Sequence, residues 1–219
     1  MSVPAGGLTY KDIQDELVGE RFGVGLLTPI KRWITLRYAQ IWGDSEWPFK
    51  RVWRENWSVT SVTPTMPAAY WKTTKLVRTD GTEVVYLEPN AFDSSYPVGG
   101  QGSGPPAHFT VVNGQIILGP AISGTASLIH SYERRPCRYT AADVLTPGTM
   151  VADTDYPVWP VDWHYALVVG ATSTGLKVQN DPTWDSLESE FGSIIVSMRE
   201  DLLPPDQYGN VQYGKDSFG

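Results

Sequence analysis

Three histidines, one cysteine and a pair of neighbouring aspartates are the side chains of this 219-residue chain whose types could carry chemistry. His108, His130 and His164 fall on two predicted strands and a predicted helix, without the short spacing that metal sites use. His108 and His130 could face each other across adjacent strands. A Ser-His-Asp triad needs no fixed spacing, but the chain has no Gly-x-Ser-x-Gly elbow. No motif therefore favours an enzyme.

The cysteine, the aspartates and a glycine-rich run all have structural explanations. Cys137 alone cannot form an intrachain disulfide or a thiolate metal site, so we interpret it as a lone thiol at a strand edge. Asp153 and Asp155 would need a cleft to act as an acid–base pair, so a surface loop is favoured. Residues 99–104 lack the Lys-Ser/Thr and the helix of a phosphate-binding loop, so they predict a surface loop or a partner contact. No cofactor or metal is expected.

Composition excludes several classes of protein. With 41% hydrophobic and 19% charged residues, the chain can form a packed core. A formal net charge of −7 argues against a protein that binds nucleic-acid phosphates over a broad surface, but it does not exclude one that encloses DNA without binding it. The first residues have no basic or apolar run, and the apolar stretch at 165–171 is too short to span a bilayer. We expect a soluble protein, made in the cytoplasm, without membrane contact.

Residues 104–136 carry the clearest strand signals. Asn113-Gly114 supplies two successive positive φ angles, which predicts a tight hairpin between strands at His108–Val112 and 115–118. Gly119-Pro120 ends the second strand, because proline cannot donate to a ladder. A third strand at 125–132 would complete a three-strand meander.

Further strand signals lie upstream of this meander. Residues 57–63 alternate between polar and apolar side chains, as on a half-buried strand. Asp80-Gly81 marks a second hairpin turn, between strands at 72–78 and 82–87. The segment 89–106 is predicted to be a loop.

Two helices are predicted before this β-rich segment. Thr9 and the acid three residues later indicate a capping box for the first helix, which ends near Gly23. Thr28 followed by Pro29 predicts the start of the second helix. Gly43 predicts its end in the left-handed position.

Two more helices are predicted after the β-rich segment. The third runs over 161–177, and small residues such as Gly170 would let another helix approach closely. Asp181 and Pro182 predict the start of the fourth helix, which Pro204-Pro205 ends. Five aromatic side chains are expected to pack the core of the helices: Trp33, Tyr38, Trp163, Trp184 and Phe191.

The connector after the second helix concentrates large aromatics. Trp47, Phe49, Trp53 and Trp57 could bind sugars or stack on bases, or they could fill the junction between a helical layer and a sheet. We favour the junction, because each ring buries a large apolar area. The second helix also carries three basic residues, for which a solvated face is favoured over contact with an acidic neighbour: Lys31, Arg32 and Arg37.

The predicted fold class is α+β, with a four-helix core, an inserted antiparallel β-domain and an extended C-terminal arm. The expected parts are helical residues 1–56, the β-domain 57–140, helical residues 141–203 and the arm 204–219. The arm is polar and rich in glycine, so by itself it cannot bury enough surface to fold. We predict that its three aromatic side chains dock on a partner: Tyr208, Tyr213 and Phe218.

This order of elements resembles the head-to-tail adaptor (connector) proteins of tailed double-stranded-DNA bacteriophages. The resemblance covers about residues 13–202, and it is a pattern of aromatics and prolines rather than a catalytic signature. The Gly-Pro-Pro at 104–106 and the loop before it depart from the pattern. The matching positions are Trp33, Tyr38, Trp42, Trp47, Trp53, Gly104-Pro105, Phe109, Ile116-Ile117-Leu118, Pro120, the stretch 128–132, Pro136, Pro157 and Pro160.

The resemblance implies a structural protein of the virion neck, between capsid and tail. Such adaptors form a homo-oligomeric ring, typically a dodecamer, beneath the portal protein. The helical part surrounds a channel through which double-stranded DNA passes without specific binding. A terminal arm docks on the portal or an adjacent subunit, and the lower face receives the stopper or tail protein.

Two other classes of function remain open. A carbohydrate-binding β-sandwich module of a virion protein is the first alternative, since the chain has nine Trp and eleven Tyr residues. It predicts exposed, coplanar aromatics on one sheet face, whereas most Trp residues lie on or beside the predicted helices. An enzyme ranks third, because it predicts a cleft with convergent His and acidic side chains.

Overall fold

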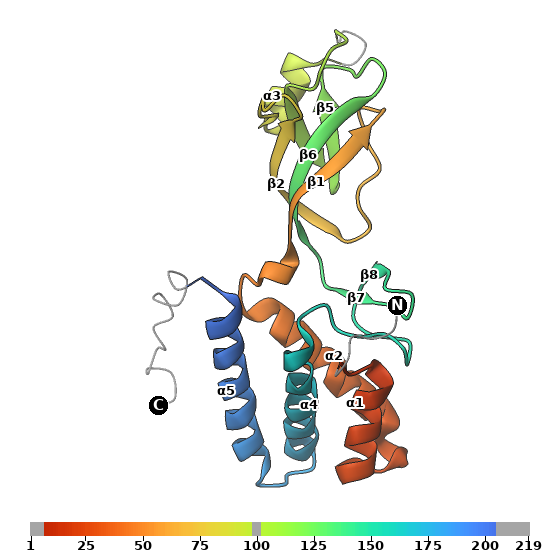
Figure 1. Cartoon of the computed structure of the whole chain (residues 1–219), viewed down its shortest axis with the longest axis vertical. Helices are drawn as coiled ribbons and strands as arrows, with labels where there is room; N and C mark the ends of the chain where they lie inside the picture. The colour runs from red at the N-terminus through yellow and green to blue at the C-terminus, as the bar shows by residue number, and fades with distance from the viewer. Residues whose placement is uncertain (1–6, 98–101, 205–219) are drawn as a thin grey trace. The chain divides into compact units, whose positions relative to one another are not determined.

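A computed structural model describes residues 7–97 and 102–204 of the chain. It divides into two compact units, drawn in Figure 1: a helical unit, Met1–Phe49 and Pro136–Gly219, and a β unit, Lys50–Arg135. The helical unit also holds a small two-stranded sheet of β7 (Cys137–Tyr139) and β8 (Leu145–Pro147). The fold is therefore mixed α+β, as the sequence predicts.

The first helix, α1 (Tyr10–Leu17), begins at the predicted cap. The Thr9 hydroxyl accepts a hydrogen bond from the backbone N–H of Asp12 at 3.1 Å, and the Asp12 carboxylate accepts one from the Thr9 N–H at 2.9 Å. A π-helical turn, Val18–Phe22, leads to Gly23, whose φ of 71° ends the segment. The capping box and the Gly23 terminus are confirmed.

The second helix, α2 (Leu27–Asp44), has neither of its predicted end signals. A 3₁₀ turn, Val24–Leu26, runs directly into it, so Leu26 is the N-cap residue and Thr28 lies within the first turn. Gly43 is helical and has no positive φ, and Ser45 ends the helix in an extended conformation. The predicted start was wrong because the preceding turn already points the chain along the helix axis, and the predicted end was wrong because Asp44 continues the helix past Gly43.

The helix α4 (Tyr165–Val178) contacts α1, α2 and α5 (Trp184–Leu202). The predicted role of its small residues is confirmed, because a Cβ at Gly170 would lie 2.9 Å from the Phe191 ring. A Cβ at Gly175 would lie 2.5 Å from Phe22 and 2.6 Å from Trp33. The glycines therefore set how closely the helices pack.

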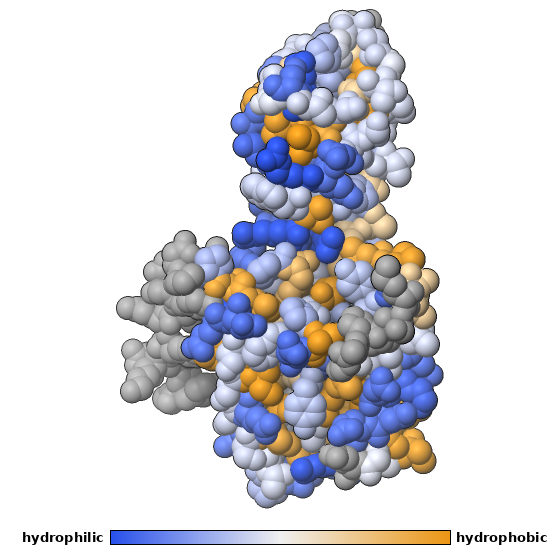
Figure 2. Space-filling model, in the orientation of Figure 1, coloured by the Kyte–Doolittle hydropathy of each residue, from blue (hydrophilic) through white to orange (hydrophobic). Residues whose placement is uncertain are grey.

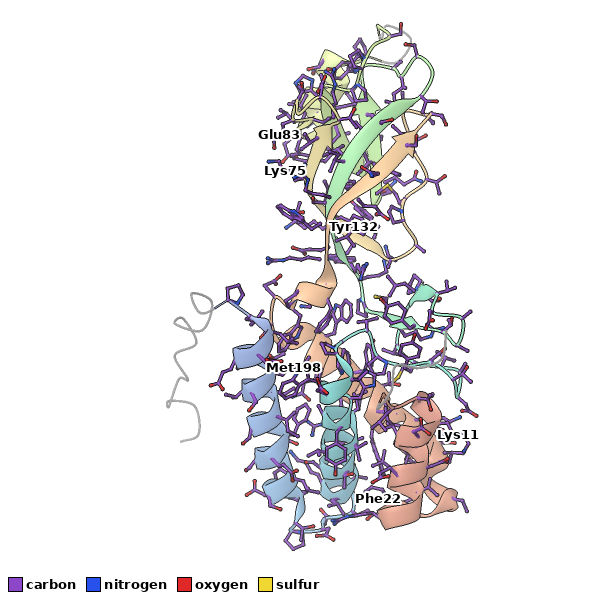
Figure 3. The ribbon with its side chains drawn as sticks, in the orientation of Figure 1. Lys11, Phe22, Lys75, Glu83, Tyr132 and Met198 are labelled. Atoms are coloured by element: carbon purple, nitrogen blue, oxygen red, sulfur yellow. The ribbon has the colours of Figure 1, made fainter. Side chains whose placement is uncertain are left out.

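The helix α5 starts two residues later than predicted. Its N-cap residue is Thr183, and the Asp181 carboxylate accepts hydrogen bonds from the Thr183 N–H at 2.9 Å and hydroxyl at 2.7 Å. Asp181 thus organises the turn before the helix instead of capping it. Leu203 ends the helix in an extended conformation, which the following Pro204 favours. On the inner face Met198, labelled in Figure 3, is fully buried.

The β unit contains two sheets instead of one meander. The strands β1 (Arg51–Val59), β6 (Ala126–Arg134) and β2 (Tyr70–Arg78) form one antiparallel sheet in that order. The strands β3 (Val85–Tyr86), β4 (His108–Val112) and β5 (Gln115–Gly119) form the other.

The predicted hairpin is confirmed, but the predicted third strand of the meander is wrong. Asn113 and Gly114 have φ angles of 51° and 76° at the turn between β4 and β5. β6, however, pairs with β1 and β2 and not with β5. Pro120 has no N–H to continue the ladder, so the chain leaves that sheet after β5. His108 and His130 therefore lie in different sheets and do not face each other.

Three local predictions in the β unit need correction. The Asp80-Gly81 turn is confirmed by a bond from the Arg78 N–H to the Thr82 carbonyl at 2.8 Å, but the returning chain joins the other sheet, where β3 runs parallel to β4. The strand predicted at 57–63 corresponds to β1, which begins earlier, at Arg51. The prediction missed this start because a bulge disrupts the alternation of polar and apolar side chains. The helix α3 (Pro89–Ser95) lies inside the predicted loop, with Pro89 in its first turn.

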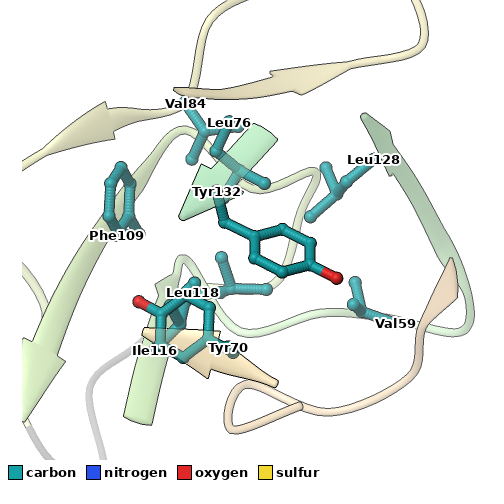
Figure 4. Close-up of a cluster of buried hydrophobic side chains, with 9 residues drawn as sticks. All are labelled: Val59, Tyr70, Leu76, Val84, Phe109, Ile116, Leu118, Leu128 and Tyr132. Atoms are coloured by element: carbon teal, nitrogen blue, oxygen red, sulfur yellow. The ribbon is translucent and has the colours of Figure 1, made fainter. Parts of the chain in front are cut away.

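Both sheets contribute side chains to the core of the β unit (Figure 4). Tyr132 from β6 and Tyr70 from β2 lie among aliphatic residues of β4, β5 and their neighbours. Burial of this cluster holds the two sheets together. Its members are Val59, Tyr70, Leu76, Val84, Phe109, Ile116, Leu118, Leu128 and Tyr132.

Candidate functional site

The three histidines lie apart, each in its own structural contact. The His108 ring contacts the Tyr96 hydroxyl at 2.6 Å. His164 is buried, with the Leu8 N–H on Nδ1 at 3.0 Å and the Trp159 carbonyl 3.1 Å from Nε2. Burial lowers the pKa of His164, against the opposing effect of these hydrogen bonds. No group of three or more His, Cys, Asp and Glu residues in the described part of the chain could hold a metal ion.

His130 is packed among aromatic rings in the core of the β unit. It is 0% exposed, stacks on Trp57 with 4.8 Å between ring centroids, and lies beside Tyr70 and Tyr132. Its Nε2 lies 3.0 Å from the Thr73 hydroxyl, while Nδ1 has no hydrogen-bond partner. Burial lowers the pKa of His130 to about 4. The ring is therefore neutral at physiological pH and acts as part of the core.

Asp153 and Asp155 differ in exposure, which corrects the prediction that both lie on a surface loop. Asp153 is exposed, but Asp155 is 1% exposed. The Asp155 carboxylate accepts hydrogen bonds from the N–H groups of Val151 and Ala152 at 2.8 Å, and it pairs with Arg138 at 2.6 Å. It is a structural anchor of the loop, with every contact directed at its own unit.

Cys137 and its neighbour Tyr38 are also structural. The thiol is fully buried on β7, and a buried, apolar thiol is a poor nucleophile. The Tyr38 hydroxyl donates a hydrogen bond to the Cys137 carbonyl. Burial, the largest effect, raises the pKa of Tyr38 well above its ordinary value.

The five aromatics predicted to pack the helical core all lie in the helical unit. Trp33, Tyr38 and Phe191 are buried. Trp163 and Trp184 are half-buried, and the Lys177 ammonium lies 4.4 Å from the centre of the Trp184 ring. These residues pack the helical unit, and the buried Nε1 of Trp163 has no hydrogen-bond partner among the described residues.

Arg37 corrects the prediction of a solvated basic face. It is 8% exposed and pairs with Glu188 of α5 through both guanidinium ends. Its Nε donates to the Thr174 hydroxyl at 2.7 Å, and Phe191 lies below the guanidinium at 4.8 Å. Burial opposes ionisation of Glu188, but the hydrogen bonds from Arg37 and Ser173 outweigh it and lower the Glu188 pKa. The acidic neighbour of Arg37 thus belongs to the same chain.

The four aromatics of the connector divide between core and surface. Trp47 is 0% exposed, and its Nε1 donates to the Ile41 carbonyl at 2.6 Å, so it is buried within the helical unit. Trp57 packs against the core of the β unit. Trp53, however, is 74% exposed, so the same prediction was wrong for it.

A β-bulge explains the exposure of Trp53. The register of β1 against β6 shifts between Val52 and Glu55, and Arg54 has a φ of 59°. The Arg54 N–H is held by the Ser131 hydroxyl at 3.1 Å. The extra residue turns the Trp53 side chain away from the core side, which Val52 contacts. Such bulges commonly re-aim a side chain at a binding surface.

Trp53 borders a groove of about 330 Å³ on the face of the β1-β6-β2 sheet opposite to the core. We call it the Trp53 groove. Lys75 of β2, labelled in Figure 3, and the apolar Ile129 of β6 are among its lining residues. Three basic and no acidic side chains are among its lining residues, which are Trp53, Arg54, Lys75, Val77, Arg78, Thr79, Gly81, Ile129 and Ser131.

An indole beside cations can contact a flat apolar surface and an anionic group together. In Figure 2 the visible face of the β unit likewise interleaves strongly hydrophilic and hydrophobic residues. No sequence motif announces this groove. The sequence features that contribute to it are the aromatic residues at 47–57 and Arg54, which follows Trp53. The bulge is what places Trp53 and Arg54 on the surface.

Two predicted sites fall wholly or partly outside the described residues. Tyr208, Tyr213 and Phe218 of the predicted arm lie in the segment 205–219, beyond the part that the structure describes. Of the glycine-rich run, only Gly102 to Gly104 can be placed. The Gly104 N–H donates to the Ala121 carbonyl at 2.9 Å, and the Ala121 N–H donates to the Gly102 carbonyl at 3.1 Å.

Comparison with known proteins finds no matching family model and no matching curated protein. Within residues 7–97 and 102–204, no helix is both long and apolar enough to cross a membrane. Any functional inference therefore depends on the geometry of the described residues. That geometry offers a binding surface on the β unit, and the titratable groups of both cores are engaged in structure.

Proposed function

We propose that this chain is a head-to-tail adaptor of a tailed bacteriophage. In this proposal it forms a ring beneath the portal, extends the DNA channel and offers the attachment surface for the stopper or tail. The observation that carries it is the insertion of a separate β unit, Lys50–Arg135, between helices that pack together. That arrangement supports the likeness of element order to the adaptor family.

The finer architecture belongs to the same proposal. The four helices α1, α2, α4 and α5 form the body of the ring, with α4 in contact with each of the other three. The β unit is the projecting domain. The segment after Pro204 is the arm, and its aromatic residues dock on the portal or on an adjacent subunit.

The charge distribution supports a role for the helical unit beside DNA. Residues Lys50–Arg135 carry eight basic and six acidic side chains, a formal net charge of +2. The rest of the chain carries nine basic and eighteen acidic side chains, a formal net charge of −9. A negatively charged wall repels the phosphates weakly, which lets a polyanion slide instead of binding.

A carbohydrate-binding module is the second candidate, and one observation favours it. Trp53 on β1 and Trp71 on β2 are 74% and 63% exposed, on two strands of the same sheet. Exposed indoles offer flat apolar faces on which sugar rings can stack. Saturating, indole-dependent binding to a glycan by the free protein would favour this candidate.

The deciding experiment is the mass of the purified protein by light scattering, alone and with the portal ring of the same virus. A monomer that becomes a stoichiometric ring on the portal supports the adaptor. A monomer that ignores the portal but binds a glycan overturns the adaptor and supports the sugar-binding module. Protection of the segment after Pro204 from protease on the portal, but not in the free protein, would support the arm.

A further inference from the structure

The Trp53 groove has basic side chains that the described residues of its own chain leave unpaired. Arg54 and Lys75 are exposed, and within the described residues neither side chain makes an ion pair or hydrogen bond. Arg78, at the end of the groove, pairs with Asp80. Trp and Arg are the residue types most enriched where proteins bind one another.

The outer face of α5 has the opposite charge. Asp185, Glu190, Glu200 and Asp201 are exposed along it, and the one basic residue of α5, Arg199, is paired with Asp44. Asp185, Glu190 and Asp201 make no ion pair with any described residue. The acids of α1 are more engaged, since Asp12 closes a capping box and Asp15 pairs with Lys11.

The middle of this α5 face is small. Ser189, Gly192 and Ser193 are exposed there, and a Cβ at Gly192 would meet no atom within 4 Å. Gly192 thus differs from Gly170 and Gly175, where neighbouring rings of the same chain require a glycine. A glycine in an exposed helix interior weakens the helix, and no contact with the described residues calls for one at this position.

We propose that the Trp53 groove of one copy docks on the outer face of α5 of a second copy. The Trp53 ring packs on the small surface around Gly192, and Lys75 and Arg54 pair with Glu190 and Asp185. Charge complementarity selects this occupant, because a unit of formal charge +2 meets one of −9.

This inference rests on the proposed function, since a ring needs one surface of each copy to meet a different surface of the next. The interface is heterologous by construction: the groove lies on the β unit and its target on the helical unit. Each copy therefore has one of each, as ring closure requires.

Cross-linking between two single-cysteine variants tests the proposed contact directly. Thr79 is exposed and lines the groove, and Ser193 is exposed on α5. Full-length Thr79→Cys and Ser193→Cys are mixed under mild oxidation, alone at high concentration and on the portal ring. The native Cys137 is fully buried and so contributes little. A disulfide-linked dimer is expected in the mixture and not in either variant alone.

A matched control and a charge exchange sharpen this test. Ser61 is exposed on the β unit but does not line the groove, so Ser61→Cys should not cross-link to Ser193→Cys. Adding Lys75→Glu to the Thr79→Cys variant should lower the yield of the cross-linked dimer about tenfold, because like charges then meet at the interface. Adding Glu190→Lys as well should restore it. Gly192→Leu should leave the monomer folded, since its side chain meets open space, but should abolish the cross-link.

The outcomes separate this inference from the proposed function. A ring on the portal without the Thr79–Ser193 cross-link would overturn the interface and leave the adaptor in place. A specific cross-link in a protein that ignores the portal would support the interface and overturn the adaptor. Salt-sensitive binding of a DNA duplex by the groove, with no cross-link under either condition, would overturn the interface in favour of nucleic acid.

Discussion

The helical unit and the β unit use their polar and aromatic side chains in opposite ways. In the helical unit, Arg37, Glu188 and Asp155 all bond within the unit, and Trp47 is completely buried. In the β unit the core is dominated by apolar contacts, while Trp53 and two basic neighbours stand on the surface.

This difference indicates where recognition resides. A buried ion pair or an internally satisfied indole stabilises or specifies its own fold and has little capacity left for a partner. An exposed indole beside unpaired cations does the reverse, since it contributes little to stability until another surface covers it. The core of the helical unit therefore keeps its polar groups for its own fold, whereas the exposed sheet face of the β unit and the exposed acids of α5 are left for the proposed interface.

The largest expected effect is the loss of Trp47 from the helical unit. Trp47→Ala removes a fully buried ring that stacks on Phe49 and bonds to the Ile41 carbonyl. We expect the free energy of unfolding of the full chain to fall by about 3–5 kcal/mol. Equilibrium urea denaturation followed by circular dichroism measures it. A loss below about 1 kcal/mol would contradict the description of the helical unit as a closed core.

The second effect, in the β unit, is a loss of stability in acid caused by His130. Its pKa of about 4 lies below the ordinary value of 6.5, so the unfolded chain binds more protons between these values. Titration of His130 leaves the free energy of unfolding unchanged above about pH 6.5 and lowers it by about 3 kcal/mol as the pH drops to about 4. His164, whose pKa is also lowered, adds to this loss in the helical unit.

Replacing His130 isolates its contribution. His130→Phe keeps a ring of similar size beside Trp57 and Tyr132 but cannot take up a proton. The difference between wild type and variant should therefore change with pH between about 6.5 and 5, before Glu188 and other carboxylates with lowered pKa values begin to titrate. Parallel pH dependences in the two proteins would exclude His130 as the cause.

The third effect compares glycines of the helical unit that do and do not face its interior. Gly175→Ala places a Cβ 2.5 Å from the Phe22 ring, so we expect a loss of about 1–3 kcal/mol despite the better helix propensity of alanine. Gly192→Ala meets open space and should gain up to about 1 kcal/mol. Melting curves of both variants measure the contrast. Equal effects would mean that Gly175 does not set the spacing of the helices.

Local signals in the sequence were enough to predict many element ends. The Thr9 capping box, the Asn113-Gly114 hairpin and the stop before Pro204 each depend on a few adjacent residues. The start of α2 could not be predicted in this way, because the 3₁₀ turn before it decides which residue is the cap. The partner of β6 depends on residues about 75 positions away in β1, a contact that no local pattern encodes.

The candidate surface was harder to predict than the fold. Trp47 and Trp53 are six residues apart and chemically identical, yet one is 0% and the other 74% exposed. A bulge at Arg54 makes the difference, and its positive φ at a non-glycine residue has no signature in the sequence. Arg37 was missed for a similar reason, because its partner Glu188 lies 151 residues away.

The smallest effect on stability, and the sharpest test of the comparison, is expected for Trp53. Trp53→Ala removes a ring that is 74% exposed, so the free energy of unfolding should change by no more than about 0.5 kcal/mol. Trp57→Ala, four residues along the same strand, removes a ring stacked on His130 and should cost several times more. Self-association on the portal, measured by light scattering, should show the opposite ranking. Trp53→Ala should lose more self-association than Trp57→Ala, although it loses less stability. A Trp53→Ala variant that is as destabilised as Trp57→Ala would place the ring in the core and remove the contrast between the two units.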